Sequence, residues 1–534
     1  MLNTTLLHQL ITASAERAPD APALTAGQTS LSYRALDEQV AGIASGLVGL
    51  GLDRGERVGI FLDKRAETVV ASFAAARAGG VFVPVNPILK PEQVGHILRD
   101  CNARVLITSP ERLPLIAETL AHCHDLRQVI LTGPLTKPVD LPATGIFQWA
   151  DLLAAPPRAG HRVIDNDMLA ILYTSGSTGR PKGVVLSHRN MVAGAKSVAS
   201  YLGNNPDDTL LAALPLSFDA GFSQLTTAFH SGARVVLINY LLPQDVLKAV
   251  VREKVTGLTA VPPLYIQLAQ LNWPETVTEH LRYFANTGGR MPLETLKALR
   301  AHLPRTRPFL MYGLTEAFRA TYLPPEQADI RPDSIGKAIP NAEVLVLRED
   351  GTECSANEPG ELVQRGAHVA MGYWNDPEKT AERFKPLPDS APGRQPGLVL
   401  PEIAVFSGDT VRRDEEGYLY FIGRRDEMMK TSGYRVSPTE VEEILYATQL
   451  VGECVAFGVA HASLGQAICV IATPREGHTL DTATLLAECK QRMPAYMVPS
   501  TIELRDGPLP RNPNGKIDRK TLSTEFEQAH KGEQ

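Results

Sequence analysis

Residues 173–183 bring hydroxyl side chains, glycines and two cations together in the stretch Tyr-Thr-Ser-Gly-Ser-Thr-Gly-Arg-Pro-Lys-Gly. Glycine allows backbone N–H groups to turn towards an anion, and the hydroxyls and Lys182 add further donors. An apolar segment, residues 168–172, leads directly into this stretch. The pattern predicts a loop that wraps a polyphosphate. It differs from the G-x-x-x-x-G-K-[ST] loop, because no glycine directly precedes Lys182 and Gly183 follows it in place of Ser or Thr.

Four further polar motifs follow in order: Met-Tyr-Gly-Leu-Thr-Glu at 311–316, Ser-Gly-Asp at 407–409, Gly-Arg-Arg-Asp at 423–426 and Asn-Gly-Lys-Ile-Asp-Arg at 514–519. With the loop they resemble the motifs of the acyl-adenylate-forming superfamily, which contains acyl-CoA ligases, amino-acid adenylation domains of peptide synthetases and luciferases. The resemblance runs from about Leu6 to Leu522. It implies an ATP-dependent, AMP-forming ligase that uses Mg²⁺.

The resemblance assigns the nucleotide contacts residue by residue. Donors to the leaving phosphates come from the loop, namely Thr174, Ser175, Gly176, Ser177, Thr178, Gly179 and Lys182. Contacts to the base, the sugar and the α-phosphate come from Gly288, Gly289, Tyr312, Gly313, Thr315, Asp409 and Arg424. Glu316 is expected to hold Mg²⁺, a hard cation that prefers carboxylate and phosphate oxygens. A structural ion pair remains the alternative for Asp409 and Arg424.

The second group of implied residues belongs to a mobile C-terminal domain. Lys516 is expected to enter the site, where it neutralises the charge that develops between the acyl carboxylate and the α-phosphate. Asp426 matches the family's hinge, and Gly433 matches the glycine that lines the tunnel for a pantetheine thiol. No segment with a carrier serine follows Leu522, so the thiol acceptor is expected to be CoA or a separate carrier protein.

The substrate depends on a different set of residues, namely Phe218, Asp219, Ser223, Met311 and Arg319. The Phe-Asp pair is typical of amino-acid adenylation domains, where the aspartate accepts the substrate ammonium. A buried carboxylate is costly without a cation, which makes a charged amine a reasonable partner for Asp219. The alternative is that Asp219 caps a turn or pairs with an arginine, for which Arg319 is the candidate.

Local sequence around these residues resembles two groups, stand-alone prolyl-AMP ligases of secondary metabolism and acyl-CoA ligases found near exopolysaccharide genes. We therefore expect an amino acid such as proline, transferred to a carrier protein, with a non-amino acid and CoA as the alternative. Two other classes stay open: a catalytically silent nucleotide-binding regulator and a luciferase-like oxygenase. All four of Lys182, Glu316, Asp409 and Lys516 are present, which argues against the regulator.

Alternating helical and strand patterns must position these residues. Leu36, Val40, Ile43 and Leu47 share one helical face, a buried strand is expected at 58–62, a helix at 66–78 and a strand at 81–83. Such repeated units predict an α/β fold with doubly wound, largely parallel sheets. At 534 residues the chain is too long for one core. We expect an adenylation core at 1–425 and a small α+β domain at 426–534.

Composition narrows the remaining classes. A net charge of −6 argues against a nucleic-acid surface, and 44% hydrophobic with 21% charged residues argues against disorder. The six cysteines form no C-x-x-C pair, as expected of reduced thiols in the cytoplasm. The sequence has no uninterrupted run of eighteen apolar residues, so no membrane-spanning helix is expected. The first 22 residues do not have the pattern of a signal peptide. The sequence leaves the oligomeric state open.

Overall fold

The computed structural model describes residues 4–135, 137–141, 144–174, 181–391, 397, 400–425, 427–431, 434–461 and 464–530. Two large, mostly parallel sheets dominate these residues; the first is antiparallel at both edges and the second at one edge only. In the first sheet the spatial order is β16 (Lys337–Ala338), β15 (Thr321–Leu323), β14 (Arg307–Tyr312), β13 (Tyr283–Asn286), β12 (Gly257–Ala260), β10 (Thr209–Ala212), β11 (Arg234–Leu237), β1 (Pro22–Ala26) and β2 (Thr29–Ser32). In the second it is β19 (Gly372–Tyr373), β9 (Lys182–Ser187), β8 (Met168–Thr174), β4 (Val81–Pro84), β3 (Arg57–Phe61), β5 (Ala103–Thr108), β6 (Gln128–Leu131) and β7 (Gly145–Gln148).

Helices connect and cover these sheets, as repeated β-α-β units require. Those of the first half are α1 (Gln9–Arg17), α2 (Tyr33–Gly49), α3 (Ala66–Ala78), α4 (Pro91–Asp100), α5 (Leu113–Leu120), α6 (Trp149–Leu153), α7 (His188–Leu202) and α8 (Asp219–Ser231). Those that follow are α9 (Pro243–Arg252), α10 (Pro262–Leu268), α11 (Val277–His280), α12 (Leu293–His302) and α13 (Pro377–Arg383), with short 3₁₀ turns η1 (Thr315–Ala317) and η2 (Pro325–Gln327). The prediction of doubly wound sheets is confirmed.

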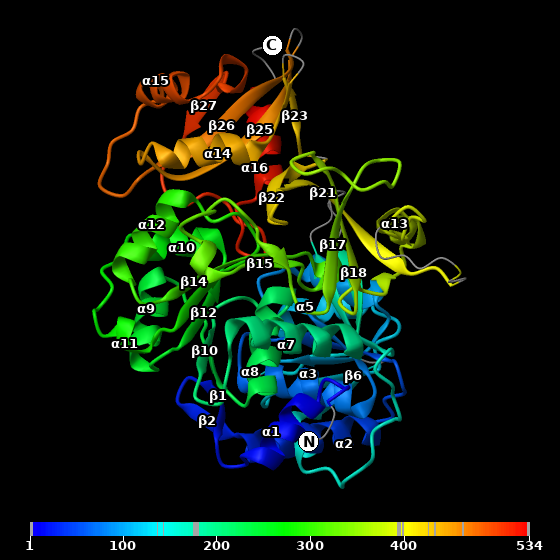
Figure 1. Ribbon diagram of the computed structural model, residues 1–534. Helices are drawn as coiled ribbons and strands as arrows, with labels where there is room; N and C mark the ends of the chain where they lie inside the picture. The colour runs from blue at the N-terminus through cyan, green and yellow to red at the C-terminus, as the bar shows by residue number, and fades with distance from the viewer. Residues whose placement is uncertain are drawn as a thin grey trace.

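Local sequence explains why α3 forms where the pattern predicted it. Small alanines allow the helix to be buried on nearly all sides, and Gly79 ends it with a left-handed φ of 90°. Phe73 of α3 stacks on Phe222 of α8, whose ring also stacks on Phe82 of β4. Helices α3, α7 and α8 therefore lie between the two sheets (Figure 1) and join them into one core.

A third, antiparallel sheet was not predicted from the sequence. It contains β17 (Ala342–Leu347), β18 (Gly360–Gly366), β21 (Ile403–Arg413), β20 (Phe384–Pro386) and β22 (Leu419–Arg424). Its strands come from separate parts of residues 342–424, so no regular period in the sequence marked them. The sheet matters for function because β21 and β22 pair Asp409 with Arg424 across the ladder.

The fourth sheet forms the centre of the small C-terminal domain. Its strands are β24 (Tyr434–Val436), β23 (Met429–Thr431), β26 (Gly465–Pro474), β25 (Val451–His461) and β27 (Thr501–Leu504). Around it lie α14 (Pro438–Ala447), α15 (Thr482–Arg492), η3 (Ala495–Met497) and α16 (Arg519–Ala529). Helix α14 begins at Pro438, because proline suits the first helical turn. This part has two hydrophobic clusters of its own, so it forms a separate core. Its mixture of strands and helices is that of an α+β domain.

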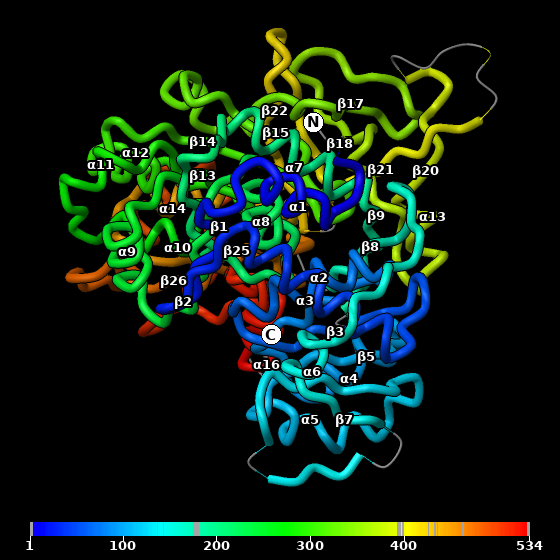
Figure 2. The backbone as a smooth tube through the Cα atoms, turned by 90° about the horizontal axis from the view of Figure 1, so that it is seen from below, coloured from blue at the N-terminus to red at the C-terminus, as the bar shows by residue number. Residues whose placement is uncertain are grey.

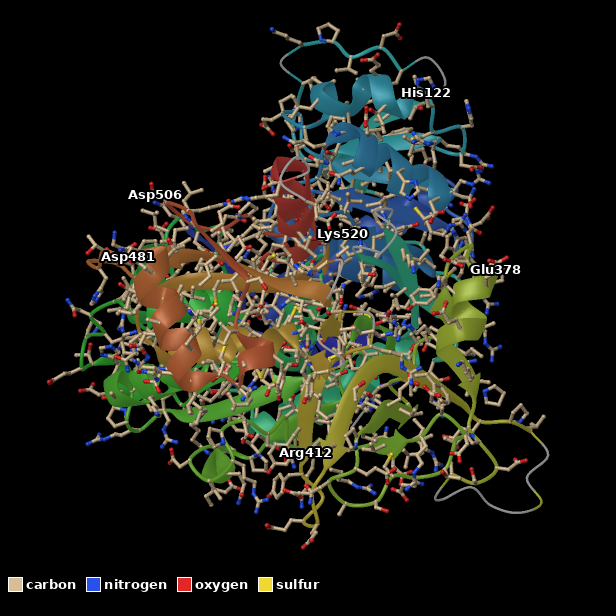
Figure 3. All side chains as sticks on the ribbon, turned by 90° about the horizontal axis from the view of Figure 1, so that it is seen from above. His122, Glu378, Arg412, Asp481, Asp506 and Lys520 are labelled. Atoms are coloured by element: carbon tan, nitrogen blue, oxygen red, sulfur yellow. The ribbon has the colours of Figure 1, made fainter. Side chains whose placement is uncertain are left out.

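The C-terminal domain sits over one end of the large domain (Figure 1). Seen from below, α16 lies near the line where the green and blue parts of the large domain meet (Figure 2). Figure 3 gives the view from above, with Lys520 of α16 close to the centre and Asp481, Asp506 and His122 near the outline. None of the helices in the described part of the chain is both long and apolar enough to cross a membrane.

Candidate active site

Asp409 and Tyr312 form the first polar pair of the site. The Tyr312 hydroxyl donates to Asp409 Oδ2 at 2.5 Å, and Arg424 Nε lies 3.6 Å from Asp409 Oδ1. Asp409 is buried, and desolvation raises the pKa of its carboxyl against the opposing effect of the Arg424 charge. The carboxylate thus faces both a tyrosine from β14 and an arginine from β22. It can accept from the vicinal hydroxyls of a ribose, although part of its capacity is used within the protein.

Glu316 lies in the turn that follows β14 and is held by a residue that the sequence did not single out. The Tyr373 hydroxyl donates to Glu316 Oε1 at 2.6 Å, and Lys182 Nζ lies 5.8 Å from the Tyr373 ring centroid. Burial and the Glu316 charge raise the pKa of Tyr373, which keeps its hydroxyl protonated as a donor. Strand β19 therefore brings one tyrosine between the acidic and the basic residue.

The donor chemistry around Glu316 fits Mg²⁺. Among the described residues, no three His, Cys, Asp or Glu side chains converge to form a closed metal site. Mg²⁺ usually binds through one or two carboxylates together with substrate phosphates and waters, so one oriented carboxylate beside a phosphate site is sufficient. The Tyr373 bond fixes that carboxylate as an outer-shell partner does.

Lys516 reaches this region from the C-terminal domain. A Cβ placed on Gly288 would lie 3.0 Å from Lys516 Cε, so the glycine leaves room for the lysine chain. Gly288 also has a φ of 77°, which a side chain would make unfavourable. Burial, followed by the Arg424 charge, lowers the pKa of Lys516 to about 8, while Asp219 and Asp409 oppose the shift. The lysine therefore stands within the electrostatic reach of both carboxylates.

Several hydrogen bonds hold the C-terminal domain, including the turn that carries Lys516, against the large domain. Asn86 Nδ2 donates to the Pro513 carbonyl at 2.7 Å. On the other side of the interface, Glu443 Oε1 accepts from the Leu293 backbone N–H at 3.0 Å. Gln449 Nε2 donates to Glu294 at 3.0 Å. These bonds fix a pose in which Lys516 is inserted into the site.

Asp219 begins α8 and forms a closed ion pair. Arg319 Nη1 lies 3.2 Å from Asp219 Oδ2, and the two side chains are only 2% and 3% exposed. Thr315 Oγ1 donates weakly to the other oxygen at 3.4 Å. Desolvation raises the pKa of Asp219, and the Arg319 charge opposes it. Arg319 is the partner that the sequence left open as an alternative, so the carboxylate has a cation without any substrate amine.

The backbone before Arg319 is strained. Phe318 is fully buried and has φ 56° and ψ −43°, which a bulky side chain rarely adopts. Its ring fills the space beside Gly194, where an added Cβ would come within 2.2 Å of the ring. Gly313 allows the Arg319 backbone to approach, because an added Cβ there would lie 3.2 Å from Arg319 Cα. The strained residue directly precedes the arginine that pairs with Asp219.

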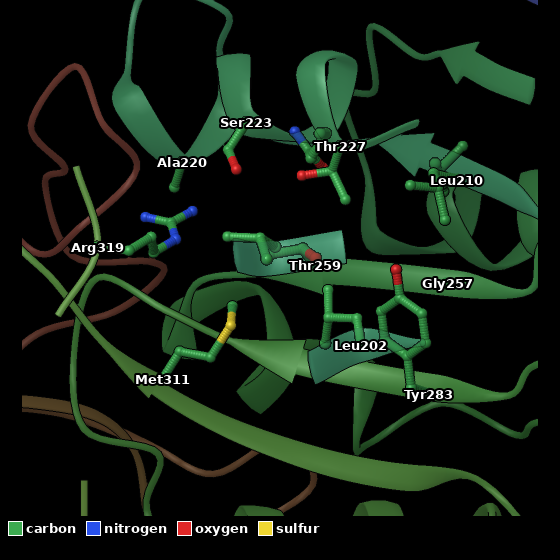
Figure 4. Close-up of a pocket in the computed structure, with 13 residues that line it drawn as sticks. Leu202, Leu210, Ala220, Ser223, Thr227, Gly257, Thr259, Tyr283, Met311 and Arg319 are labelled. Atoms are coloured by element: carbon green, nitrogen blue, oxygen red, sulfur yellow. The ribbon is translucent and has the colours of Figure 1, made fainter. Parts of the chain in front are cut away.

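A cavity extends from this pair into the first sheet (Figure 4). Met311, Ala220, Ser223 and Arg319 lie at one side, and Leu210, Gly257 and Tyr283 lie at the other. Its volume is ≈ 20 Å³, little more than the ~10–15 Å³ that one water needs. The Met311 sulfur accepts from Tyr201 at 3.0 Å, which fixes one wall. Phe218, which is largely buried, caps the start of α8 outside the lining.

The predicted residues that the structure describes form two groups, one around Asp409 and Glu316 and one around Asp219 and Arg319. Thr174 and Lys182 pair across β8 and β9 at the base of the phosphate loop. Gly289 follows Gly288 against Pro262. The predictions for Ser175, Gly176, Ser177, Thr178 and Gly179, and those for Asp426 and Gly433, fall outside the described residues. Sequence reasoning missed Tyr373, Asn86 and two polar residues of α8, Gln224 and Thr227. Gly-Tyr-Trp at 372–374 and the polar spacing along α8 were the available signals.

Comparison with known proteins gives the class. The model of the AMP-binding enzyme family matches residues 11–374, and the model of the AMP-binding enzyme C-terminal domain matches residues 440–516. The chain belongs to this family. Its relatives include ligases that act with CoA or with a carrier protein, and solved structures similar to it contain ATP or ATP with a magnesium ion, in agreement with the AMP-forming ligase class that the motifs predicted.

Individual relatives differ in substrate. The chain is 30% identical to the L-proline--[L-prolyl-carrier protein] ligase of Pseudomonas fluorescens, over 98% of this chain and 99% of that one. It is 32% identical to a feruloyl-CoA synthase of Amycolatopsis, over 94% and 95%. It also matches bacitracin synthase 3 of Bacillus licheniformis at 29% identity over 97% of this chain, but spans only 8% of that synthase. A solved anthranilate CoA ligase in complex with anthranoyl-AMP superposes with a TM-score of 0.87 at 26% identity, covering 98% of both chains.

Proposed function

We propose that this ligase adenylates a small carboxylic acid and transfers the acyl group to a pantetheine thiol. The observation that carries the proposal is the placement of Lys516. The C-terminal domain inserts it beside Gly288, where Asp409 on the nucleotide side and Asp219 on the acyl side both act on its pKa. A cation at this junction is what the attack of a carboxylate on a phosphoryl group requires.

In the first step a carboxylate oxygen attacks the α-phosphorus of ATP in line, and pyrophosphate leaves. Lys516 neutralises charge between the acyl oxygen and the α-phosphate, and Thr315 contacts that phosphate. Asp409 orients the ribose, Tyr312 lies against the base, and Thr174 with Lys182 holds the leaving phosphates. When bound at Glu316, Mg²⁺ supplies positive charge to the phosphate oxygens. Positioning and fixed charge carry the step.

The second step requires the lysine to leave. We assign residues 1–425 to the core and 426–534 to the moving domain, with Asp426 as the hinge and Gly433 lining the thiol path. The contacts of Asn86, Glu443 and Gln449 are hydrogen bonds across a polar interface. Each such bond contributes little net stability, so moving the C-terminal domain from one orientation to the other costs little free energy. The thiolate then attacks the acyl carbon and AMP leaves.

The Asp219–Arg319 pair supports one order for the two candidate classes of carboxylic acid substrate. The carboxylate is already neutralised by a buried guanidinium, so binding does not require a substrate ammonium. The first candidate is therefore a carboxylic acid without an α-amine. The second is an amino acid such as proline, delivered to a carrier protein, which the prolyl-carrier ligase relative favours.

ATP–pyrophosphate exchange with matched acids tests both candidates. Proline and cyclopentanecarboxylate have nearly the same shape and differ in the ammonium. Asp219→Ala is expected to affect both acids alike if the aspartate serves Arg319, and proline far more if it binds the ammonium. Adding CoA or a holo carrier protein then identifies the acceptor.

Lys516→Ala tests the observation that carries the proposal. Exchange is expected to fall by about 10²–10³-fold, the effect of removing one preorganised electrostatic group. Thioester formation from supplied acyl-adenylate should be largely kept. Lys490→Ala on the exposed face of α15 is the matched control. An unchanged rate of ATP–pyrophosphate exchange in Lys516→Ala would show that the lysine has no role in adenylate formation.

A further inference from the structure

One face of α8 is polar although it lies inside the large domain. Ala220, Ser223, Gln224 and Thr227 follow the spacing i, i+3, i+4, i+7 and all line the cavity beside Arg319. Ser223, Gln224 and Thr227 are 2%, 5% and 2% exposed. A buried helix face is usually apolar, because polar groups removed from water need partners. The polar side chains of this stripe therefore indicate a binding site for a ligand with polar groups.

Two oxygens of the stripe have no hydrogen-bond partner among the described residues, namely Gln224 Oε1 and Thr227 Oγ1. Gln224 Nε2 donates to the Gly221 carbonyl at 3.0 Å, which fixes the orientation of the amide. Its oxygen is thus an unpaired acceptor on a residue that lines the cavity. Arg319 Nε, at the same cavity, is an unpaired donor. Thr227 can donate or accept.

The surroundings restrict what group can bind there. Arg319 is neutralised by Asp219, so the cavity offers no uncompensated charge for an ionic group. A distal carboxylate would face the Gln224 oxygen, and an ammonium would find no free carboxylate. Leu210, Tyr283 and the close approach of Tyr283 to Gly257 close the far end. A neutral group that both donates and accepts, and that is about the size of one hydroxyl, fits the ≈ 20 Å³ cavity and the charges around it.

We propose that Gln224 and Thr227 read a hydroxyl group on a short acyl chain, so that the acid activated is a hydroxy acid. The inference rests on the proposed function and names the substrate class of the same site. The acid's hydroxyl donates to Gln224 Oε1 and accepts from Thr227 or Arg319 Nε. An unsubstituted chain that expels water leaves these atoms unpaired, and sites of this kind discriminate strongly against such analogues.

The test compares ATP–pyrophosphate exchange with matched acids. Butyrate is paired with its β- and γ-hydroxylated forms, and γ-aminobutyrate serves as the ammonium arm. We expect kcat/KM to favour at least one hydroxy acid over its partner by about tenfold or more. Gln224→Leu and Thr227→Val should each reduce that ratio by about tenfold. Thr226→Val is the matched control, because its hydroxyl bonds to the Ser223 carbonyl and does not line the cavity.

A second measurement is independent of turnover. The hydroxyacyl and acyl sulfamate analogues of the adenylate are titrated into the enzyme by calorimetry, with the same variants. Equal affinity for the two analogues, or a ratio that Gln224→Leu and Thr227→Val leave unchanged, overturns the inference. Preference for γ-aminobutyrate also overturns it. Absence of exchange with every acid contradicts the proposed function, and the sulfamate pair then still decides the role of the stripe.

Discussion

The nucleotide side and the acyl side of the site balance their charges in different ways. On the nucleotide side Asp409 has a tyrosine and a half-exposed arginine as partners, and Glu316 has one tyrosine hydroxyl. On the acyl side Asp219 and Arg319 form a pair that is almost completely buried. The first side keeps carboxylate oxygens available for ligands, whereas the second uses its charges on each other. In our proposal, recognition of the acid is therefore left to neutral hydrogen-bonding groups.

The largest expected difference between the two sides is in stability. Arg319→Met leaves Asp219 buried without a cation, and breaking such a pair costs about 3–5 kcal/mol. We expect the free energy of unfolding, measured by urea denaturation, to fall by that amount. The double variant Asp219→Asn with Arg319→Met should recover most of the loss, because no charge remains unpaired.

The surface pair of Arg34 with Asp20 supplies the control for that experiment. Its side chains are 55% and 86% exposed, and exposed pairs contribute about 0–1 kcal/mol. Arg34→Met should therefore change the unfolding free energy very little. If Arg319→Met and Arg34→Met lowered the free energy of unfolding by similar amounts, burial of the Asp219–Arg319 pair would not explain the loss.

Sequence reasoning predicted single residues better than the contacts between them, for a physical reason. Local patterns fixed α3 with its Gly79 cap and β3, and contiguous motifs marked Glu316, Asp409 and Lys516. The Tyr373 bond to Glu316 and the Asn86 bond to Pro513 join residues far apart in the chain. No local period records such contacts. The positive φ of Phe318, whose ring packs against the distant Gly194, is likewise not recorded in any local pattern.

The next effect concerns the carboxylate expected to hold Mg²⁺. Tyr373→Phe keeps the ring contact with Phe384 and the position of Lys182 over the ring, and removes only the hydroxyl. Loss of such an outer-shell bond typically costs 10–100-fold in metal affinity. We expect the Mg²⁺ concentration for half-maximal exchange to rise within that range. Tyr420→Phe, which loses a 3.0 Å bond to Asp414, is the matched control and should leave it unchanged.

A smaller, pH-dependent effect is expected from Lys516. Its pKa is lowered to about 8, and the charged form is the one that neutralises the phosphoryl oxygens. The kcat/KM of adenylation should therefore fall as pH rises through about 8, by up to tenfold per unit, since this parameter reports the free enzyme. Lys516→Arg stays charged at these pH values. Its exchange rate is expected to be lower but to lack this decline; an identical decline would assign the titration to another group.

The smallest effect tests whether the acyl side depends on how the C-terminal domain is held. Asn86→Ala removes the hydrogen bond to Pro513, which is worth about 0.5–1.5 kcal/mol and corresponds to roughly 2–10-fold. Adenylation should fall by that factor, because fewer molecules hold Lys516 in the site. Thioester formation from supplied acyl-adenylate should not fall, since it uses the other pose. Equal losses in both half-reactions would mean that Asn86 supports the large domain and does not bias its pose. The acid preference should be the same as in the unmodified enzyme, because Gln224 and Thr227 belong to α8 and do not move with the lysine.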